Sequence, residues 1–85
     1  MAEVKREVRG VPRWLIGEYL EELGARAQDD GWLHGAGWAA RLALMDDYRI
    51  GSLRVGRVQL ELAGDDDAVA GVWAVLEKKL LRAGG

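Results

Sequence analysis

The sequence predicts an α+β domain with the element order β-α-β-β-β-β-α, and three patterns support this prediction. A helical stripe of apolar residues follows Pro12, and a second one follows Asp65. Apolar and polar residues alternate in five other segments, one before the first stripe and four between the two stripes. Strands this close in sequence pair antiparallel. Each strand has one apolar face, so two amphipathic helices are expected to pack on one face of the sheet. The 85 residues are expected to form a single domain, 1–85.

The first helix is predicted over Val11–Gln28. Pro12 suits the first helical position, because it has no N–H to leave unsatisfied and its φ is already helical. Gly24 and the run Asp29-Asp30-Gly31 indicate where this helix ends. At 3.6 residues per turn, the following apolar residues share one stripe: Leu15, Ile16, Tyr19, Leu20, Leu23 and Ala27. This stripe is expected to face the sheet.

Alternation of apolar and polar residues predicts five strands. Their ranges are Ala2–Arg9, Trp32–His34, Trp38–Met45, Ile50–Val55 and Arg57–Ala63. The segments 35–37 and 46–49 are expected to be turns, and Gly56 is expected to bend the chain between the last two strands. Arg6 falls on the apolar face of the first strand, which an edge strand tolerates.

A second helix is predicted after Gly64. The acidic residues Asp65, Asp66 and Asp67 suit its start, because Asp accepts hydrogen bonds from free backbone N–H groups and acids complement the positive end of a helix. Basic residues, among them Arg82, lie near its negative end. Its expected buried stripe consists of Val69, Val72, Trp73, Leu76 and Leu80.

Composition excludes several classes of protein. The chain has no cysteine, hence no disulfide and no thiolate metal site, and His34 is its only histidine, so a zinc site is not expected. No apolar run is long enough to span a bilayer and the N-terminus is no signal peptide, which predicts a cytoplasmic protein without a membrane partner. A net charge of −2 with interspersed signs argues against nucleic-acid binding.

The polar face of the predicted sheet is left to solvent or to a partner. It carries Arg41, Arg57 and Gln59, which we single out as possible interaction residues together with Trp14. Trp14 lies roughly opposite the apolar stripe of the first helix. It either folds over the sheet edge or the incoming strand from the first turn, or it stays exposed as an anchor for a partner, because Trp is a frequent hot-spot residue. A protein partner or a homo-oligomer is therefore expected.

Three segments, PRWLIGEYLEELG, IGSLRVGRVQLELAG and the closing RAGG, resemble the C-terminal domain of MoaD-related proteins from thermophilic bacteria. In those proteins the domain, of unknown function, follows a β-grasp module that resembles the sulfur-carrier subunit of molybdopterin synthase. The resemblance runs from about Glu7 to Gly85 and is weaker over 28–45. It implies a TBP-like β-α-β4-α topology. The β-grasp module is absent from this sequence, and the resemblance transfers no catalytic residue.

Three functions remain open, and a fourth, nucleic-acid binding through the open sheet face, is suggested by the TBP-like topology and opposed by the net charge. The absence of a catalytic constellation favours a non-catalytic accessory or interaction domain, related by resemblance to sulfur-carrier or molybdenum-cofactor chemistry, without a cofactor or metal. A small-molecule-binding domain would use a groove between the helices and the sheet. A carrier would use the closing Gly84-Gly85, because sulfur carriers end in a flexible Gly-Gly whose carboxylate is activated. A glycine stop at the end of the second helix is the plainer interpretation of these two residues.

Overall fold

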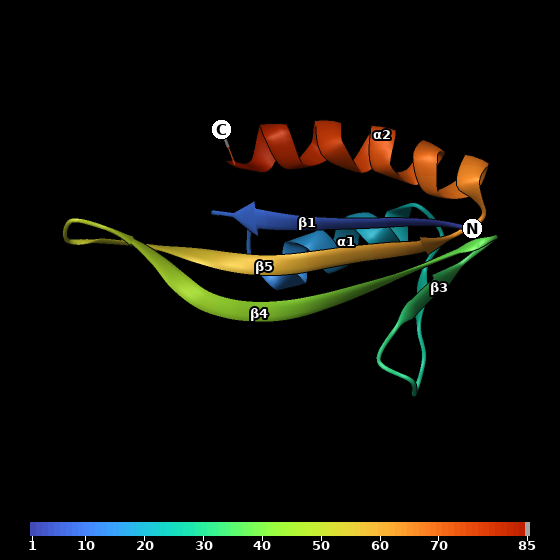
Figure 1. The fold of residues 1–85 in the computed structure, drawn as a ribbon, viewed down its shortest axis with the longest axis horizontal. Helices are drawn as coiled ribbons and strands as arrows, with labels where there is room; N and C mark the ends of the chain where they lie inside the picture. Colours follow the sequence, from blue (N-terminus) through green and yellow to red (C-terminus); the bar gives the residue numbers. More distant parts are fainter. Residues whose placement is uncertain (85) are drawn as a thin grey trace.

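The computed structural model describes residues 1–84 and contains five strands and two helices (Figure 1). Their bounds are β1 (Ala2–Arg9), α1 (Arg13–Glu22), β2 (Arg26–Ala27), β3 (Leu33–Gly35), β4 (Trp38–Ile50), β5 (Leu53–Gly64) and α2 (Asp66–Gly84). The strands form one sheet in the order β1-β5-β4-β3-β2, and every neighbouring pair is antiparallel. The predicted α+β class and the element order are confirmed.

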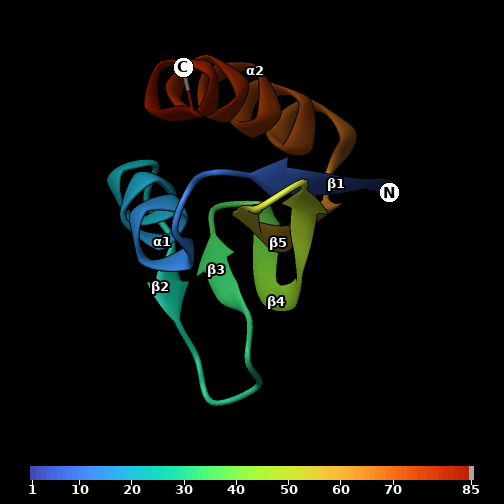
Figure 2. The same cartoon turned by 90° about the vertical axis from the view of Figure 1, so that its left-hand side faces the viewer.

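The helices pack on the apolar face of the sheet. α1 contacts β4, and α2 contacts β1 and β5, so α2 runs alongside β1 in both views (Figures 1 and 2). One continuous core joins both helices to the sheet. Its buried side chains are Val8, Val11, Ile16, Leu20, Ala25, Trp38, Ala40, Val58, Leu60, Leu62, Val69, Val72 and Leu76. Of the predicted α2 stripe, Trp73 and Leu80 are only partly buried.

Arg6 lies on the helix-facing side of β1, as its sequence position indicated, and its guanidinium lies 5.2 Å from the centroid of the Trp73 ring. A cation over an indole face is attracted by the electrons of the ring. This contact gives the charged side chain a favourable place on the apolar face of the edge strand.

The first helix is shorter than predicted, because Gly24 closes it. The Gly24 N–H donates to Glu21 O at 3.0 Å and the Ala25 N–H donates to Leu20 O at 3.1 Å. Gly24 has φ 107°, a left-handed value that glycine adopts at low cost. These two hydrogen bonds satisfy two carbonyls of the last helical turn. The prediction that the helix reaches Gln28 is therefore wrong, and Arg26–Ala27 pairs with β3 instead.

The middle of the chain also differs from the prediction. Asp46-Asp47-Tyr48-Arg49 is not a turn, and the two strands predicted on either side of Gly56 are one strand, β5. The hairpin turn is Gly51-Ser52, because Ile50 pairs directly with Leu53. Gly51 has φ 59°, as the first residue of a two-residue type II′ turn requires. Four strands still follow the first helix, as predicted, because the merging of two predicted strands into β5 is balanced by the additional strand β2.

The β4–β5 hairpin extends beyond the rest of the sheet. β1 pairs with β5 only from Arg57 to Gly64, and β3 pairs with β4 only over Trp38–Ala40. The far end of the hairpin, residues 48–55, therefore has no further strand on either side and projects from the body (Figure 1). This projection lengthens the molecule to 42 Å, against 27 and 21 Å along the other axes. Within residues 1–84, neither helix is long and apolar enough to cross a membrane.

Candidate interaction surface

A β-bulge lies where the hairpin leaves the body. Met45 pairs with Arg57 and Tyr48 pairs with Val55, so Asp46 and Asp47 together stand opposite one residue of β5. An extra residue in one strand reverses the side on which each following side chain lies. Before the bulge the even-numbered residues of β4 face the helices. After it, Tyr48 and Ile50 face the opposite, open side of the sheet.

This reversal gathers apolar side chains on the open face of the projecting hairpin. We name as the hairpin strip the cross-strand pairs Tyr48–Val55 and Ile50–Leu53 with their neighbour Met45. The side chains of Ile50 and Leu53 are 57% and 66% exposed. The opposite side of the hairpin end carries the cross-strand pair Arg49–Arg54. The projecting hairpin is thus apolar on one side and basic on the other.

Charged residues on the open face of the body are paired with one another. Arg41 donates from Nη2 to both carboxylate oxygens of Glu61, at 2.9 and 3.0 Å, and its guanidinium lies 4.8 Å from the Trp32 ring centroid. Arg57 donates to Glu7 Oε1 at 2.8 Å and to the carbonyl oxygen of Asp46 at 2.6 Å. The Asp46 contact holds the bulge against β5. Internal pairing leaves these arginines less free to bind a ligand than the sequence alone indicated.

Glu7 is the centre of a charged cluster at the base of the hairpin. Hydrogen bonds from Arg57 and then Arg9 lower the pKa of the Glu7 carboxyl below its ordinary value of 4.5. The Arg9 guanidinium also lies 4.1 Å from the centroid of the Tyr48 ring. The cluster therefore links β1 to Tyr48, the first residue beyond the bulge.

The predicted interaction residues do not form one site. Arg41, Arg57 and Gln59 lie on the open face, with Gln59 paired in register between Glu7 and Ala43. Trp14 lies on α1, on the helix side of the sheet, and is 66% exposed. Of the proposed carrier tail, Gly84 is the last residue of α2 and Gly85 lies outside the described residues.

His34 is occupied by a local contact. Its Nε2 lies 2.8 Å from Asp30 Oδ2, and Asp30 also accepts the Trp32 backbone N–H at 2.9 Å. The Trp32 hydrogen bond and then the His34 contact lower the pKa of the Asp30 carboxyl. Both residues are exposed and serve the β2–β3 turn. In the part of the chain that the structure describes, no group of three or more His, Cys, Asp or Glu side chains could hold a metal ion.

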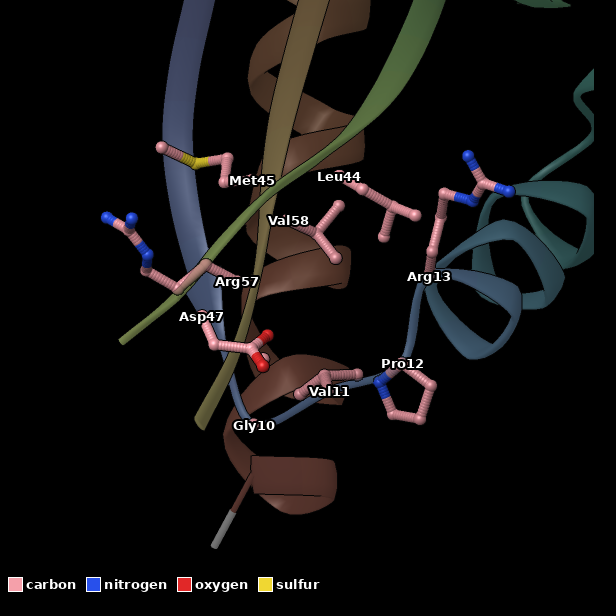
Figure 3. Close-up of a pocket in the computed structure, with 10 residues that line it drawn as sticks. Gly10, Val11, Pro12, Arg13, Leu44, Met45, Asp47, Arg57 and Val58 are labelled. Carbon is pink, nitrogen blue, oxygen red and sulfur yellow. The ribbon is translucent and has the colours of Figure 1, made fainter. Parts of the chain in front are cut away.

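Among the hollows on the surface, two bear on the predicted groove between the helices and the sheet. One, of about 390 Å³, lies at the base of the hairpin beside the start of α1, with Leu44, Val58, Val11 and Pro12 among its lining residues (Figure 3). The other, of about 410 Å³, lies between β1 and α2 and includes Trp73 and Leu80. Between the helices and the central strands, Ile16, Leu20 and Leu60 are completely buried and fill the space that a deeper groove would need.

Sequence reasoning missed the hairpin strip, although a signal was present. Gly51-Ser52 is a Gly-X pair between Tyr48-x-Ile50 and Leu53-x-Val55, which is the pattern of a two-residue hairpin turn between alternating strands. Placing a turn at 46–49 put Ile50 and Leu53 on one strand and hid their pairing.

One protein-family model matches this chain over nearly its full length. The model of the archaeal MoaD-like protein family matches residues 4–85. No curated protein matches the chain. The relation to MoaD-type proteins indicated by the helix and strand segments is therefore confirmed, and the chain belongs to the archaeal MoaD-like protein family.

Proposed function

We propose that this chain is a non-catalytic, cytosolic accessory domain that binds a protein partner through the hairpin strip, within the sulfur-carrier or molybdenum-cofactor chemistry of MoaD-related proteins. The family match supports the chemical context. The narrower resemblance, to the TBP-like domain that follows a β-grasp module, is part of the same proposal. The observation that carries it is the exposed apolar strip on the open face of a projecting hairpin.

The strip has the properties of a binding surface. Tyr48, Ile50 and Leu53 are 36%, 57% and 66% exposed, whereas Leu60 and Leu62, on the body of β5, are 0% and 1% exposed. Contiguous exposed apolar side chains with a polar rim mark interaction sites on proteins. Glu7, Arg9 and Arg57 form such a rim on one side. Each aliphatic side chain fully buried by a partner contributes roughly 1.5–3 kcal/mol before the costs of association.

Site-specific photocrosslinking in the native host tests this function. A photoreactive amino acid replaces Leu53, and a matched control places it at Leu81, which is apolar and 71% exposed on α2. The proposal predicts a discrete protein adduct from position 53 that is absent from position 81 and is reduced by Ile50→Asp. No adduct from position 53, or the same adduct from both positions, would reject the strip as a docking surface.

A second candidate, small-molecule binding, is favoured by the hollow between β1 and α2. This hollow joins an apolar wall, from Val8, Val11 and Leu80, to the acidic residue Glu77. The Arg9 guanidinium is instead held by Glu7 and Tyr48. A nuclear magnetic resonance screen with small aromatic amines tests this candidate. Binding would shift the Trp73 indole signal and the Leu80 methyl signals while leaving those of Ile50 and Leu53 in place. Shifts confined to the hairpin, or none, would remove this candidate.

A further inference from the structure

Beyond the hairpin strip, an exposed Trp14 and a hollow lined by apolar residues lie on the helix side of the molecule. We propose that two copies of this chain form a two-fold dimer in which the Trp14 side chain of each copy enters the hollow at the base of the other copy's hairpin. This inference uses no residue of the strip except Met45, which is partly buried and lies at the margin of the hollow. It goes beyond the proposed function, because the partner is a second copy and the surface lies on the other face of the sheet.

Trp14 is the projecting part of this surface. It is the second residue of α1, its side chain is 66% exposed, and it lies beside Gly17, Leu33 and Leu42 in a shallow depression. An indole left in water keeps a large apolar area exposed, and Trp is among the residues whose burial dominates binding energy. Ile16 and Leu20 of the same helix are completely buried, so the exposure of Trp14 follows from its place opposite the packed stripe.

The hollow is the receiving part. Val11 and Val58 are 4% and 3% exposed, whereas Leu44 is 67% exposed. In Figure 3, Leu44 and Val58 point toward α1, and Met45 and Arg57 point the other way. Gly10 and Gly56 line the hollow, and a Cβ at either position would meet nothing within 4 Å. The volume of about 390 Å³ falls in the range of about 300–1,000 Å³ typical of sites for organic groups.

The two parts are adjacent on one molecule. Arg13 lines the hollow, and Trp14 is the next residue of α1. A two-fold axis between them would bring each Trp14 to the other copy's hollow at the same time, which closes the assembly at two copies. Asp47 also lines the hollow, and its exposed carboxylate offers an acceptor for the indole N–H, which a buried Trp needs.

Charge complementarity favours a second copy as the occupant. Glu18 and Glu21 follow Trp14 at helical spacing and line the same depression. On the helix side of the hairpin, Arg54 and Arg49 stand directly opposite each other, and Arg54 is two residues from Gly56 of the hollow. Among the ion pairs formed within residues 1–84, none involves these four residues. Like charges directly opposite destabilise a strand pair, so carboxylates from a second α1 would relieve this repulsion.

Sedimentation velocity of the full chain over a concentration series tests the dimer. The wild type is expected to show a monomer–dimer equilibrium. Trp14→Ala should raise the dimer Kd by at least about 30-fold, since hot-spot truncations reach this size. Gly56→Leu should act similarly by filling the hollow. Leu81→Ala is the matched control: Leu81 is 71% exposed on α2, away from the strip and from the proposed dimer contact, and its truncation should leave the Kd unchanged.

A charge-exchange series supplies the second arm. Glu18→Arg with Glu21→Arg should disrupt the dimer, and adding Arg49→Glu with Arg54→Glu in the same chain should restore it. A wild type that stays monomeric at millimolar concentration would overturn the proposal, as would a dimer that survives both Trp14→Ala and Gly56→Leu. Photocrosslinking from position 53 reports on the proposed function separately. A wild type that stays monomeric but gives the position-53 adduct would reject the dimer alone. A dimeric wild type without that adduct would reject the proposed function alone.

Discussion

Met45 and Tyr48 lie on the same face of β4, although an uninterrupted strand would place them on opposite faces. Their partners on β5, Arg57 and Val55, are two residues apart and also share that face. The bulge formed by Asp46 and Asp47 accounts for the difference. A single extra residue thus decides whether the apolar side chains of the hairpin end face the helix side or the open side of the sheet.

Inserting one residue after Gly56 should reverse the hairpin end. With Asp46 and Asp47 each matched by a residue of β5, regular alternation from Met45 places Tyr48 on the helix side. The Tyr48 ring would then leave the Arg9 guanidinium, now 4.1 Å from its centroid. Ring-current shifts of the Arg9 side-chain protons measure this contact. They should disappear in the insertion variant and persist when Asp47 is deleted, because that deletion keeps Tyr48 opposite Val55. Unchanged shifts in the insertion variant would show that the bulge does not determine the face on which Tyr48 lies.

Two leucines of β5 should respond very differently to the same substitution. Leu60 is completely buried and Leu53 is 66% exposed. Leu60→Ala should lower the free energy of unfolding by about 2–5 kcal/mol, because it removes buried carbon and leaves a cavity. Leu53→Ala should change it by less than about 0.5 kcal/mol. Urea unfolding of both variants measures the contrast, and equal losses would mean that the hairpin end packs on the body.

Glu7 should give the domain a pH-dependent contribution to stability. Its folded-state pKa is lowered, chiefly by the Arg57 hydrogen bond. Such a group stabilises the fold above its unfolded pKa, and this contribution is lost as the pH falls from 4.5 through the lowered folded value. Wild type should therefore melt above Glu7→Gln at neutral pH, with the gap closing in acid. Arg57→Gln should raise the pKa of Glu7 measured by carboxyl carbon resonances. A gap that widens in acid would refute the sign of this effect.

Removing Gly84 and Gly85 should barely change the melting temperature, since terminal residues of a chain make few contacts. The carrier alternative needs a chemical test, because this deletion would spare the fold under either interpretation. Intact mass after incubation with ATP and a sulfur-carrier activating enzyme supplies it. We expect no modification. A C-terminal adenylate, or sulfur in place of one oxygen, would establish the carrier function.

The sequence correctly predicted the helices and strands whose ends are determined by nearby residues. The bounds of β1, the start of β4 and the buried face of α2 follow from alternation, glycine turns and an acidic helix start. Gly24 carried a local signal too, but the pairing of Arg26–Ala27 with β3 depends on residues farther along the chain. The region from Asp46 to Gly56 was misread for the same reason. Paired acids and a glycine are typical of turns, yet here register with β5 keeps them in a strand.

For the candidate surface too, the sequence predicted what depends on one strand and missed what depends on the pairing of several strands. Alternation along single strands placed Arg41, Arg57 and Gln59 on the open face, where they lie. It could not show that Glu61 and Glu7 pair with the two arginines, because those partners come from other strands. Nor could it show the hairpin strip, which exists only once β4 and β5 are paired across the bulge. The roles of these residues in binding stay predictions.

The most direct test of the account is the affinity of the partner identified by crosslinking. Titration calorimetry would compare wild type with Ile50→Ser/Leu53→Ser, and use Leu81→Ser as the control with a similarly exposed leucine. If the hairpin strip is the docking surface, the double variant should bind at least about 30-fold more weakly, while the control binds as wild type does. Equal affinities for all three proteins would contradict the account.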